Sequence, residues 1–289
     1  MKPMLARAFN ASLIKWPGFV QPKLNGLRAM WLHEEEVLLS RDQHVWNESV
    51  LPHVFEGLRQ LTEHIKFFFP QDACMGIDGE IYCHGMSLQQ INSRGSVNRK
   101  SPHADYAKLK FNVFDVVSLL PQEKRFEFLD YLAGQSFPGV EEVSTHLCHS
   151  QEEFDRLYDL YLNKERYEGV MWRDRTAPYG FDFMCGNKEN RWNTIVKRKP
   201  RQDLVARILN RVEGEGKHAG MVGAFVCQLD DGKTFNVGSG LSDAQRRQIW
   251  DMPLEKVVGV PLRIDYEVLS DGGIPLKPTI ACVELLLMD

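Results

Sequence analysis

The sequence has no long apolar run. None of its hydrophobic stretches approaches the roughly 20 residues that a membrane-spanning helix needs. The first residues, Met1 to Arg7, also lack the apolar segment of a secretion signal. These absences argue against the membrane and secreted classes, so we expect a cytoplasmic protein.

Paired cysteines are also missing. The six cysteines are scattered and none belongs to a Cys-x-x-Cys pair, which argues against a zinc site and against a disulfide scaffold. The cluster His146-Leu147-Cys148-His149 has metal-binding residue types, but its spacing fits no structural zinc pattern. We interpret it as a loop before a helix.

An excess of positive charge is absent as well. The formal net charge of −4 argues against a protein that coats nucleic acid indiscriminately. From Arg191 to Arg211, however, the chain has many basic residues and only one acidic residue, Asp203. Such a run is either solvated surface or a surface that binds phosphates. The length of 289 residues, with 43% apolar and 26% charged residues, fits a globular chain of one large or two ordinary domains.

One stretch contains a candidate nucleophile, Gln21-Pro22-Lys23-Leu24-Asn25-Gly26-Leu27-Arg28. Lys23 lies in an apolar setting just before a glycine and an arginine. A lysine amine attacks phosphorus only once its pKa falls from about 10.4 to near 7, which costs roughly 4–5 kcal/mol and requires burial, nearby cations or a metal. The alternative is a solvated lysine beside a hairpin, because Asn-Gly is a strong turn signal.

Hydrophobic periodicity and capping patterns predict the elements around this stretch. Helices are expected around 54–65, after Ser87, between Pro121 and Gly134, and after Ser150; strands are expected at 29–32, 37–40, 76–82, 110–117, 167–173 and 195–199. Beyond a boundary at Pro200, short strands and one helix, Ser242 to Trp250, indicate a small barrel of the oligonucleotide-binding type.

Side chains two residues apart in a strand lie on the same face, and two pairs of charged residues have this spacing. Asp78 and Glu80 share one strand face, where paired acids are either exposed or hold a ribose hydroxyl or a metal. Lys197 and Lys199 share another face, with Arg198 opposite. Two lysines on an apolar strand need an anion or carboxylate, and they could supply the cations that a lysine nucleophile requires.

The motifs in chain order resemble the nucleotidyltransferase motifs of the ATP-dependent DNA ligases, and most closely those of small viral and phage members such as the Chlorella virus enzyme. The residues that carry the resemblance are Lys23, Arg28, Ser40-Arg41, Asp78-Gly79-Glu80, Phe114-Asp115, Glu168-Gly169-Val170-Met171 and Lys197-Arg198-Lys199. The resemblance implies an α+β fold. Residues 1–200 would form a nucleotidyltransferase (adenylation) domain of antiparallel sheets with flanking helices, and residues 201–289 an OB-fold β-barrel.

The resemblance also implies an activity. Lys23 would attack the α-phosphorus of ATP, expel pyrophosphate and carry AMP, which would pass to the 5′-phosphate of a nick before the 3′-hydroxyl displaces it. The cofactors would be ATP and Mg²⁺ or Mn²⁺, and the partner nicked duplex DNA. We expect ATP rather than NAD because only twenty-two residues precede Lys23. The resemblance further implies a monomer in a bacterial or phage-infected cell, acting in DNA repair, replication or recombination.

Each site residue receives an expected role from the resemblance. Phe114 would stack on the adenine, Gln21 would read its edge, and Glu80 would hold the ribose. Lys197 and Lys199 would neutralise the α-phosphate. The expected nucleotide contacts further include Leu24, Arg28, Arg41 and Glu168, the expected metal ligands are Glu168 and Glu80, and the expected DNA contacts are Arg28, Arg41, Arg94, Arg99, Lys100, Arg198 and Arg201.

The chain departs from the family pattern in four places. Asn25 replaces the usual Asp, Gly186-Asn187-Lys188 replaces Gly-Arg-Ser, the C-terminal motif is reduced to Leu276-Lys277-Pro278 and Val283-Glu284, and the segment 204–221 leaves little room for a DNA-encircling hairpin. Two alternatives stay open: an RNA ligase or mRNA guanylyltransferase of the same superfamily, and a nick-binding protein that no longer catalyses.

Overall fold

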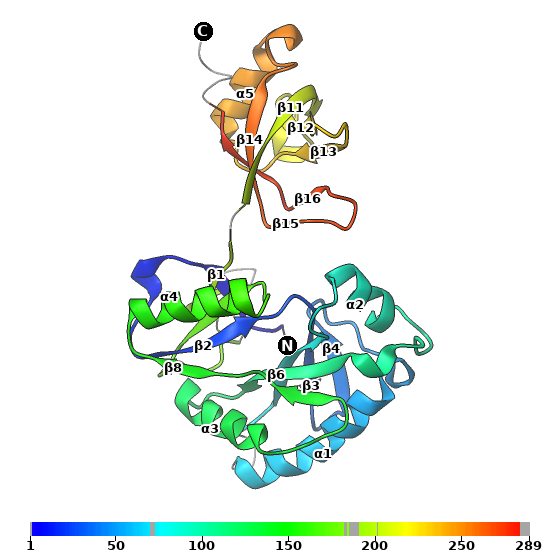
Figure 1. Cartoon of the computed structure of the whole chain (residues 1–289), viewed down its shortest axis with the longest axis vertical. Coiled ribbons are helices and arrows are strands. Elements are labelled where there is room, and N and C mark those ends of the chain that lie inside the picture. Colours follow the sequence, from blue (N-terminus) through cyan, green and yellow to red (C-terminus); the bar gives the residue numbers. More distant parts are fainter. Residues whose placement is uncertain (1, 70–72, 182–183, 185–190, 201, 284–289) are drawn as a thin grey trace. The chain divides into compact units, whose positions relative to one another are not determined.

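The chain forms two compact units, Met1–Arg198 and Lys199–Asp289. The computed structural model, drawn in Figure 1, describes residues 2–69, 73–181, 184, 191–200 and 202–283. The sequence predicted a boundary after residue 200. Arg201, the segment Gly186-Asn187-Lys188 and Glu284 lie outside the described residues.

The first unit contains two five-stranded sheets. One has the strand order β1-β10-β9-β2-β8, in which β1 and β10 are parallel and the other neighbours antiparallel. Its strands are β1 (Leu5–Ala8), β10 (Arg191–Arg198), β9 (Gly169–Asp174), β2 (Gly18–Lys23) and β8 (His146–Cys148). His146–Cys148 is therefore a strand before a helix, not the loop that we expected.

The second sheet has the order β4-β3-β5-β6-β7 and packs against helices. Its strands are β4 (Val37–Ser40), β3 (Leu27–Leu32), β5 (Gly76–Tyr82), β6 (Lys110–Val117) and β7 (Val140–Glu142). The helices of this unit are α1 (Pro52–Phe68), α2 (Leu88–Gly95), α3 (Gln122–Ala133) and α4 (Gln151–Asp159). Figure 1 shows α1 and α3 on the outer face of the second sheet and α4 over the first.

The helix signals in the sequence correspond to real caps. Ser87 and Gln90 form the predicted reciprocal capping box of α2. At α4 the Ser150 side chain accepts from the Glu153 amide, but the Glu153 carboxylate accepts from His149 N at 2.7 Å, so this box is incomplete. Short helical turns lie between the longer elements of both units. They are Ala11–Leu13, Glu48–Val50, Tyr106–Lys108, the π turn Leu160–Lys164, Gly216–His218 and Leu254–Lys256.

The second unit is a five-stranded antiparallel sheet of order β13-β12-β11-β14-β17 with one helix and a short ribbon. The elements are β11 (Gln202–Glu213), β12 (Val222–Gln228), β13 (Thr234–Val237), α5 (Asp243–Asp251), β14 (Pro261–Tyr266), the ribbon β15 (Val268–Leu269) and β16 (Pro275–Leu276), and β17 (Thr279–Cys282). Among the described residues its two edges meet only at a bridge between Ser239 and Thr279. The predicted barrel is therefore not closed by a continuous ladder.

The basic run 191–211 is largely strand. Its second half lies on β11, which the sequence did not predict because charged residues interrupt its apolar alternation. Arg207 donates to Gly259 O at 3.4 Å, and Arg211 donates to Ile249 O and lies 5.1 Å from the Trp250 ring centroid. These two guanidinium groups therefore contact the second unit itself.

No helix in the described part of the chain is long and apolar enough to cross a membrane. The described cysteines Cys74, Cys83, Cys148, Cys227 and Cys282 are free thiols.

Candidate active site

Lys23 is the last residue of β2 and lies beside Glu168. Its ammonium forms an ion pair with Glu168 Oε2 and donates to Leu24 O at 2.9 Å, and both side chains are only 19% exposed. The antiparallel register of β2 and β9 pairs Lys23 with Gly169, and Glu168 N donates to Lys23 O at 3.0 Å. The strand pairing therefore places a carboxylate against the candidate nucleophile.

Asn25 and Gly26 do not form the hairpin that the Asn-Gly pair suggested. β2 and β3 belong to different sheets, so these residues carry the chain from one sheet to the other. Gly26 N donates to Glu80 Oε1 at 2.5 Å, and a Cβ atom at Gly26 would lie 2.4 Å from Ile81 O. The backbone approaches β5 so closely here that only glycine fits.

Glu80 is the second carboxylate of this site. Burial raises the pKa of its carboxyl group, while the positive charge of Lys23, the amide of Gly26 and the charge of Arg28 act in the opposite direction. Glu168 adds to the raised pKa because a second carboxylate nearby disfavours ionisation. Lys23 thus lies in a site with two carboxylates, Glu80 on β5 and Glu168 just before β9.

Arg28 is held by Asp78. The guanidinium donates through Nε to Asp78 Oδ1 at 2.8 Å, pairs through Nη2 with Asp78 Oδ2, and donates to Met4 O at 2.8 Å. The Tyr179 hydroxyl donates to the same Asp78 carboxylate at 2.6 Å. Because of these partners the guanidinium keeps one orientation, with its Cζ atom 5.0 Å from the Phe114 ring centroid.

Phe114 is packed against two guanidinium groups. Its ring is 9% exposed and the Arg173 Cζ atom lies 5.3 Å from its centroid. Gln21 Nε2 donates to Phe114 O at 2.8 Å and to Thr145 Oγ1 at 2.9 Å, and Gln21 Oε1 accepts from Arg173 Nε at 2.8 Å. The Gln21 amide, which we expected to read an adenine edge, is buried and satisfied within the protein.

A buried ion network lies behind Phe114. Arg125 Nε donates to Asp115 Oδ1 at 2.8 Å, and Arg173 Nη1 donates to Asp115 Oδ2 at 2.7 Å. Burial alone would raise the pKa of the Asp115 carboxyl group, but the two guanidinium charges outweigh burial and lower it. The network joins β6, α3, β9 and, through Gln21, β2.

Sequence reasoning gave no role to Arg173. The signal was available, because Arg173 follows three apolar residues in a strand and a charge in such a strand needs a partner. Its partners, Asp115 and Gln21, are distant in sequence, and only the fold identifies them.

The predicted phosphate lysines belong to different units. Lys197 lies on β10, where it pairs with Met171 of β9. β10 ends at Arg198, so strand alternation does not extend to Lys199. Lys199 belongs to the second unit and donates to Glu267 Oε2 at 3.0 Å. That Lys197 and Lys199 share one strand face therefore stays a prediction, because the assigned strand ends between them.

Arg198 packs within the first unit. Its Cζ atom lies 4.2 Å from the ring centroid of Tyr158, 5.0 Å from that of Phe9 and 5.5 Å from that of Phe154, and its Nη1 pairs with Asp155. Cation–π contacts of this kind favour a fixed guanidinium. In this structure the predicted DNA contact Arg198 therefore links β10 to α4.

The other predicted DNA contacts belong to segments other than β2, the strand that carries Lys23. Arg41 is an exposed turn residue after β4, and Lys100 is exposed in the loop after α2. Arg94 lies 3.7 Å from Asp105 and Arg99 donates to Ser93 O at 2.8 Å, so both guanidinium groups have local partners.

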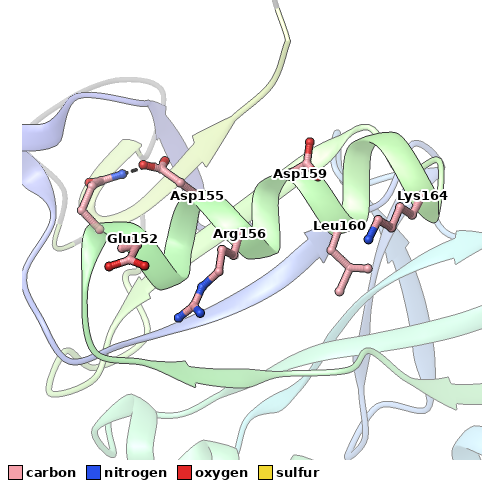
Figure 2. Close-up of a pocket in the computed structure, with 7 residues that line it drawn as sticks. Glu152, Asp155, Arg156, Asp159, Leu160 and Lys164 are labelled. Carbon is pink, nitrogen blue, oxygen red and sulfur yellow. Dashed lines mark hydrogen bonds between the residues drawn. The ribbon is translucent and has the colours of Figure 1, made fainter.

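An open hollow of about 810 Å³ lies along α4, apart from the residues around Lys23. Figure 2 shows the side chains that line it, among them Glu152, Arg156 and Lys164. Gln151 donates to Asp155 at 3.0 Å in this hollow. The hollow contains no residue with a predicted chemical role.

A divalent metal would have two carboxylates at the Lys23 site, Glu80 and Glu168. Within the ranges that the structure describes, no three His, Cys, Asp or Glu side chains gather as a metal-binding group. Mg²⁺ is commonly held by one or two carboxylates together with substrate phosphates and water, so two carboxylates beside a nucleotide site fit such an ion.

Comparisons with known proteins agree with this geometry. The family described as "ATP dependent DNA ligase domain" matches residues 3–194, and the one described as "DNA ligase OB-like domain" matches residues 213–283. No curated protein matches the chain.

Several solved structures have the same fold. A structure described as "DNA binding with a minimal scaffold: Structure-function analysis of Lig E DNA ligases" has a TM-score of 0.76 at 21% identity and covers 97% of this chain and 98% of its own. "Pmar-Lig_PreS3" has a TM-score of 0.75 at 19% identity, covering 97% of this chain and 67% of its own. The ligase domain of M. tuberculosis LigD has a TM-score of 0.50 at 19% identity, covering 97% and 93%.

The structural matches, at these identities, establish the fold. The first family match spans well over half of the 289 residues and includes Lys23, Glu80 and Glu168. The chain belongs to the ATP-dependent DNA ligase family.

Proposed function

We propose that this chain seals nicks in duplex DNA, joining a 3′-hydroxyl to a 5′-phosphate through AMP carried on Lys23. The observation that carries the proposal is the Lys23 ammonium, poorly exposed and paired with Glu168 where β2 leaves the first sheet. Membership of the ATP-dependent DNA ligase family supports ATP as the AMP donor.

In the first step the Lys23 amine attacks the α-phosphorus of ATP. A phosphorus–nitrogen bond forms, the bond to the β-phosphate oxygen breaks, and pyrophosphate leaves. The ammonium must first lose a proton, and the Glu168 carboxylate that accepts its hydrogen bond is placed to receive it. AMP then passes to the nick 5′-phosphate, and the 3′-hydroxyl displaces it.

The remaining residues position the nucleotide. Glu80 would accept a ribose hydroxyl, and Leu24 and Phe114 would line the base site. Because the Gln21 amide is already engaged, Gln21 would hold Phe114 in place instead of reading the adenine edge. Arg28, fixed by Asp78, would present its face to ribose or phosphate. Lys197 would contribute positive charge from β10.

A divalent ion, Mg²⁺ or Mn²⁺, would be held by Glu168 and Glu80. Such an ion neutralises phosphate charge during phosphoryl transfer when it is bound. Both carboxylates lie at the Lys23 site.

DNA contacts would come from basic residues outside the Lys23 site, Arg41, Arg94, Arg99 and Lys100, each from the first unit. We propose residues 1–200 as the adenylation domain and 201–289 as the OB-fold domain, and a monomer acting in DNA repair, replication or recombination. The match of an OB-like family to residues 213–283 supports the second assignment.

The test is self-labelling. The protein is incubated with α-labelled ATP or GTP and Mg²⁺ without nucleic acid, then separated on a denaturing gel, alongside Lys23→Ala. Acid-labile label from ATP only, absent in Lys23→Ala, is the expected result, followed by sealing of nicked duplex DNA. Label from GTP would favour a guanylyltransferase. No label from either nucleotide, in protein free of bound AMP, would leave a nick-binding protein.

A further inference from the structure

Four residues of the first unit close a ring of hydrogen bonds. The Met4 amide donates to the Tyr179 hydroxyl at 3.0 Å, and that hydroxyl donates to Asp78 Oδ2 at 2.6 Å. Asp78 in turn holds the Arg28 guanidinium, and Arg28 Nη2 closes the ring by donating to Met4 O at 2.8 Å. We name Met4, Tyr179, Asp78 and Arg28 the hydrogen-bond ring.

The hydrogen-bond ring joins segments that are far apart in the chain. Arg28 and Asp78 lie on the neighbouring strands β3 and β5 of the second sheet, whereas Met4 directly precedes β1 of the first sheet. Tyr179 lies in the segment after β9, and its amide donates to Ser118 O at 3.0 Å. Met4 and Tyr179 also pack in one hydrophobic cluster. The tertiary fold therefore builds the ring, not a local motif.

Most of the hydrogen-bond ring is buried. Asp78 and Tyr179 are fully buried and Met4 nearly so, whereas the Arg28 side chain is 18% exposed. Burial, followed by the negative charge of Asp78, raises the pKa of the Tyr179 hydroxyl, so this hydroxyl stays protonated at neutral pH and donates to the carboxylate. The member of the ring that is most open to a ligand is therefore the charged guanidinium.

The guanidinium of Arg28 has donors to spare. A guanidinium carries five N–H donors. Each side-chain hydrogen bond of Arg28 to the described residues goes through Nε or Nη2, so the hydrogens on Nη1 are left for another acceptor. In the register of β3 and β5, Arg28 pairs with Glu80, a carboxylate of the Lys23 site. Nη1 therefore belongs to the surroundings of the reacting phosphates.

We propose that Tyr179 is a positioning residue, whose hydroxyl, held by the Met4 amide, fixes Asp78 and so keeps Arg28 Nη1 turned toward a phosphate oxygen of the substrate. That oxygen belongs to ATP or to the nick 5′-phosphate, the two phosphates that the proposed reaction brings to Lys23. Without the hydroxyl the carboxylate can rotate, and the guanidinium follows it. Tyr179 thus acts through Asp78 and Arg28. This inference rests on the proposed function and adds a residue to it.

The test is a double-mutant cycle between Tyr179→Phe and Arg28→Lys. Tyr179→Phe removes only the hydroxyl, and Arg28→Lys keeps a positive charge beside Asp78 but has no second nitrogen to present. Each full-length protein is assayed for the rate of self-labelling at saturating ATP and for the rate of sealing pre-adenylylated nicked DNA. We expect Tyr179→Phe alone to lower one of these rates about tenfold, as the loss of a hydrogen bond to a charged group can. In the Arg28→Lys background it should lower that rate less than about twofold.

The affected step identifies the phosphate. A fall in self-labelling assigns the oxygen to ATP, and a fall confined to sealing assigns it to the nick. Tyr131→Phe is the matched control, because it removes a hydroxyl that bonds His64 Nδ1 at 2.6 Å between α3 and α1, and both rates should stay at the wild-type value. A hydroxyl that only stabilises the fold would lower the rates by the same factor with and without Arg28→Lys, and equal factors would overturn the proposal.

The outcomes separate this inference from the proposed function. If wild type neither labels itself nor seals, both fail. If wild type is active and Tyr179→Phe keeps both rates, only the inference fails. Should Tyr179→Phe melt below the assay temperature, Asp78→Asn takes its place in the cycle, since the amide keeps the shape of the side chain but holds a guanidinium less firmly. Unchanged rates in Asp78→Asn, or the same loss in both backgrounds, would then count against the proposal.

Discussion

At the residue scale, the site depends on buried charges that are fully paired. Arg173 is the clearest case, since its guanidinium joins Asp115, Gln21 and the Phe114 ring. Removing one partner of a buried ion pair leaves the other charge without compensation, and this costs far more than losing an exposed pair.

We therefore expect Arg173→Met to lower the free energy of unfolding by about 3–5 kcal/mol. Arg175→Met is the matched control, because the partly exposed Arg175 pairs with the partly exposed Glu123 at 3.6 Å and its loss should cost less than about 1 kcal/mol. Urea unfolding of both variants measures the difference. Equal losses would show that the buried network does not stabilise the first unit.

Gly26 is a second residue whose environment allows a sharp test. In Gly26→Ala the new Cβ atom would collide with Ile81 O, so the backbone next to Lys23 must move. We expect the rate of self-labelling to fall on the order of 10²-fold, since a displacement of about 1 Å can cost that much. In Gly134→Ala the nearest atom, Tyr131 O, is 3.7 Å away, so labelling should stay at the wild-type rate. Normal labelling of Gly26→Ala would contradict the tight approach to β5.

At the element scale, the packing of β7 against α3 creates a pH-sensitive contact. Burial, with the nearby negative charge of Asp130 as a second cause, raises the pKa of the Glu142 carboxyl group to about 7 from its usual 4.5. A raised carboxyl pKa means that the stability which this group contributes is full below about pH 4.5 and is lost as the pH rises through about 7.

The melting temperature of wild type should therefore fall between about pH 5 and pH 8. That of Glu142→Gln should fall less over the same interval, because its side-chain amide has no proton to release. Glu141→Gln serves as control, since Glu141 pairs with Lys110 on the exposed side and Glu142 remains intact. Thermal melts at four pH values measure the slopes. Parallel slopes for wild type and Glu142→Gln would show that Glu142 does not titrate in this interval.

At the scale of the whole molecule, each unit has its own hydrophobic core. Leu58 belongs to the core of the first unit, and Ile264 to that of the second, and both are fully buried. Units with separate cores can unfold in separate transitions.

We expect calorimetry to resolve two unfolding transitions. Leu58→Ala should lower the melting temperature of one transition, and Ile264→Ala that of the other. Each substitution removes a buried side chain and should cost about 2–5 kcal/mol within its own unit. The two variants are each other's control. A single transition that both variants shift equally would show that the units unfold together.

Much of the local structure could be predicted because its causes are local. The capping boxes at Ser87 and Ser242 depend on residues three apart, and the spacing of Val54, Leu58, Leu61 and Ile65 alone indicates a buried helix face. The motif order along the chain likewise identified the family that the comparisons confirm.

The partners of charged residues could not be predicted in this way. Arg198 on a strand face gives no sign that Tyr158 and Asp155 will enclose it, and Lys199 next to a strand gives no sign that Glu267 will hold it. β11 was missed because its charged residues conceal the strand, whose partners β12 and β14 come later in the chain.

The sequence by itself thus determined the nucleophile candidate, the order of the motifs and most helices, because each depends on residue type and on spacing within one element. Only the tertiary structure decided which carboxylate meets which cation: Glu168 with Lys23, Asp78 with Arg28, Asp115 with Arg173 and Glu267 with Lys199. The physical reason is that a charge is attracted to any opposite charge that comes within reach. Strand register and sheet order, which join residues far apart in the chain, determine which one does.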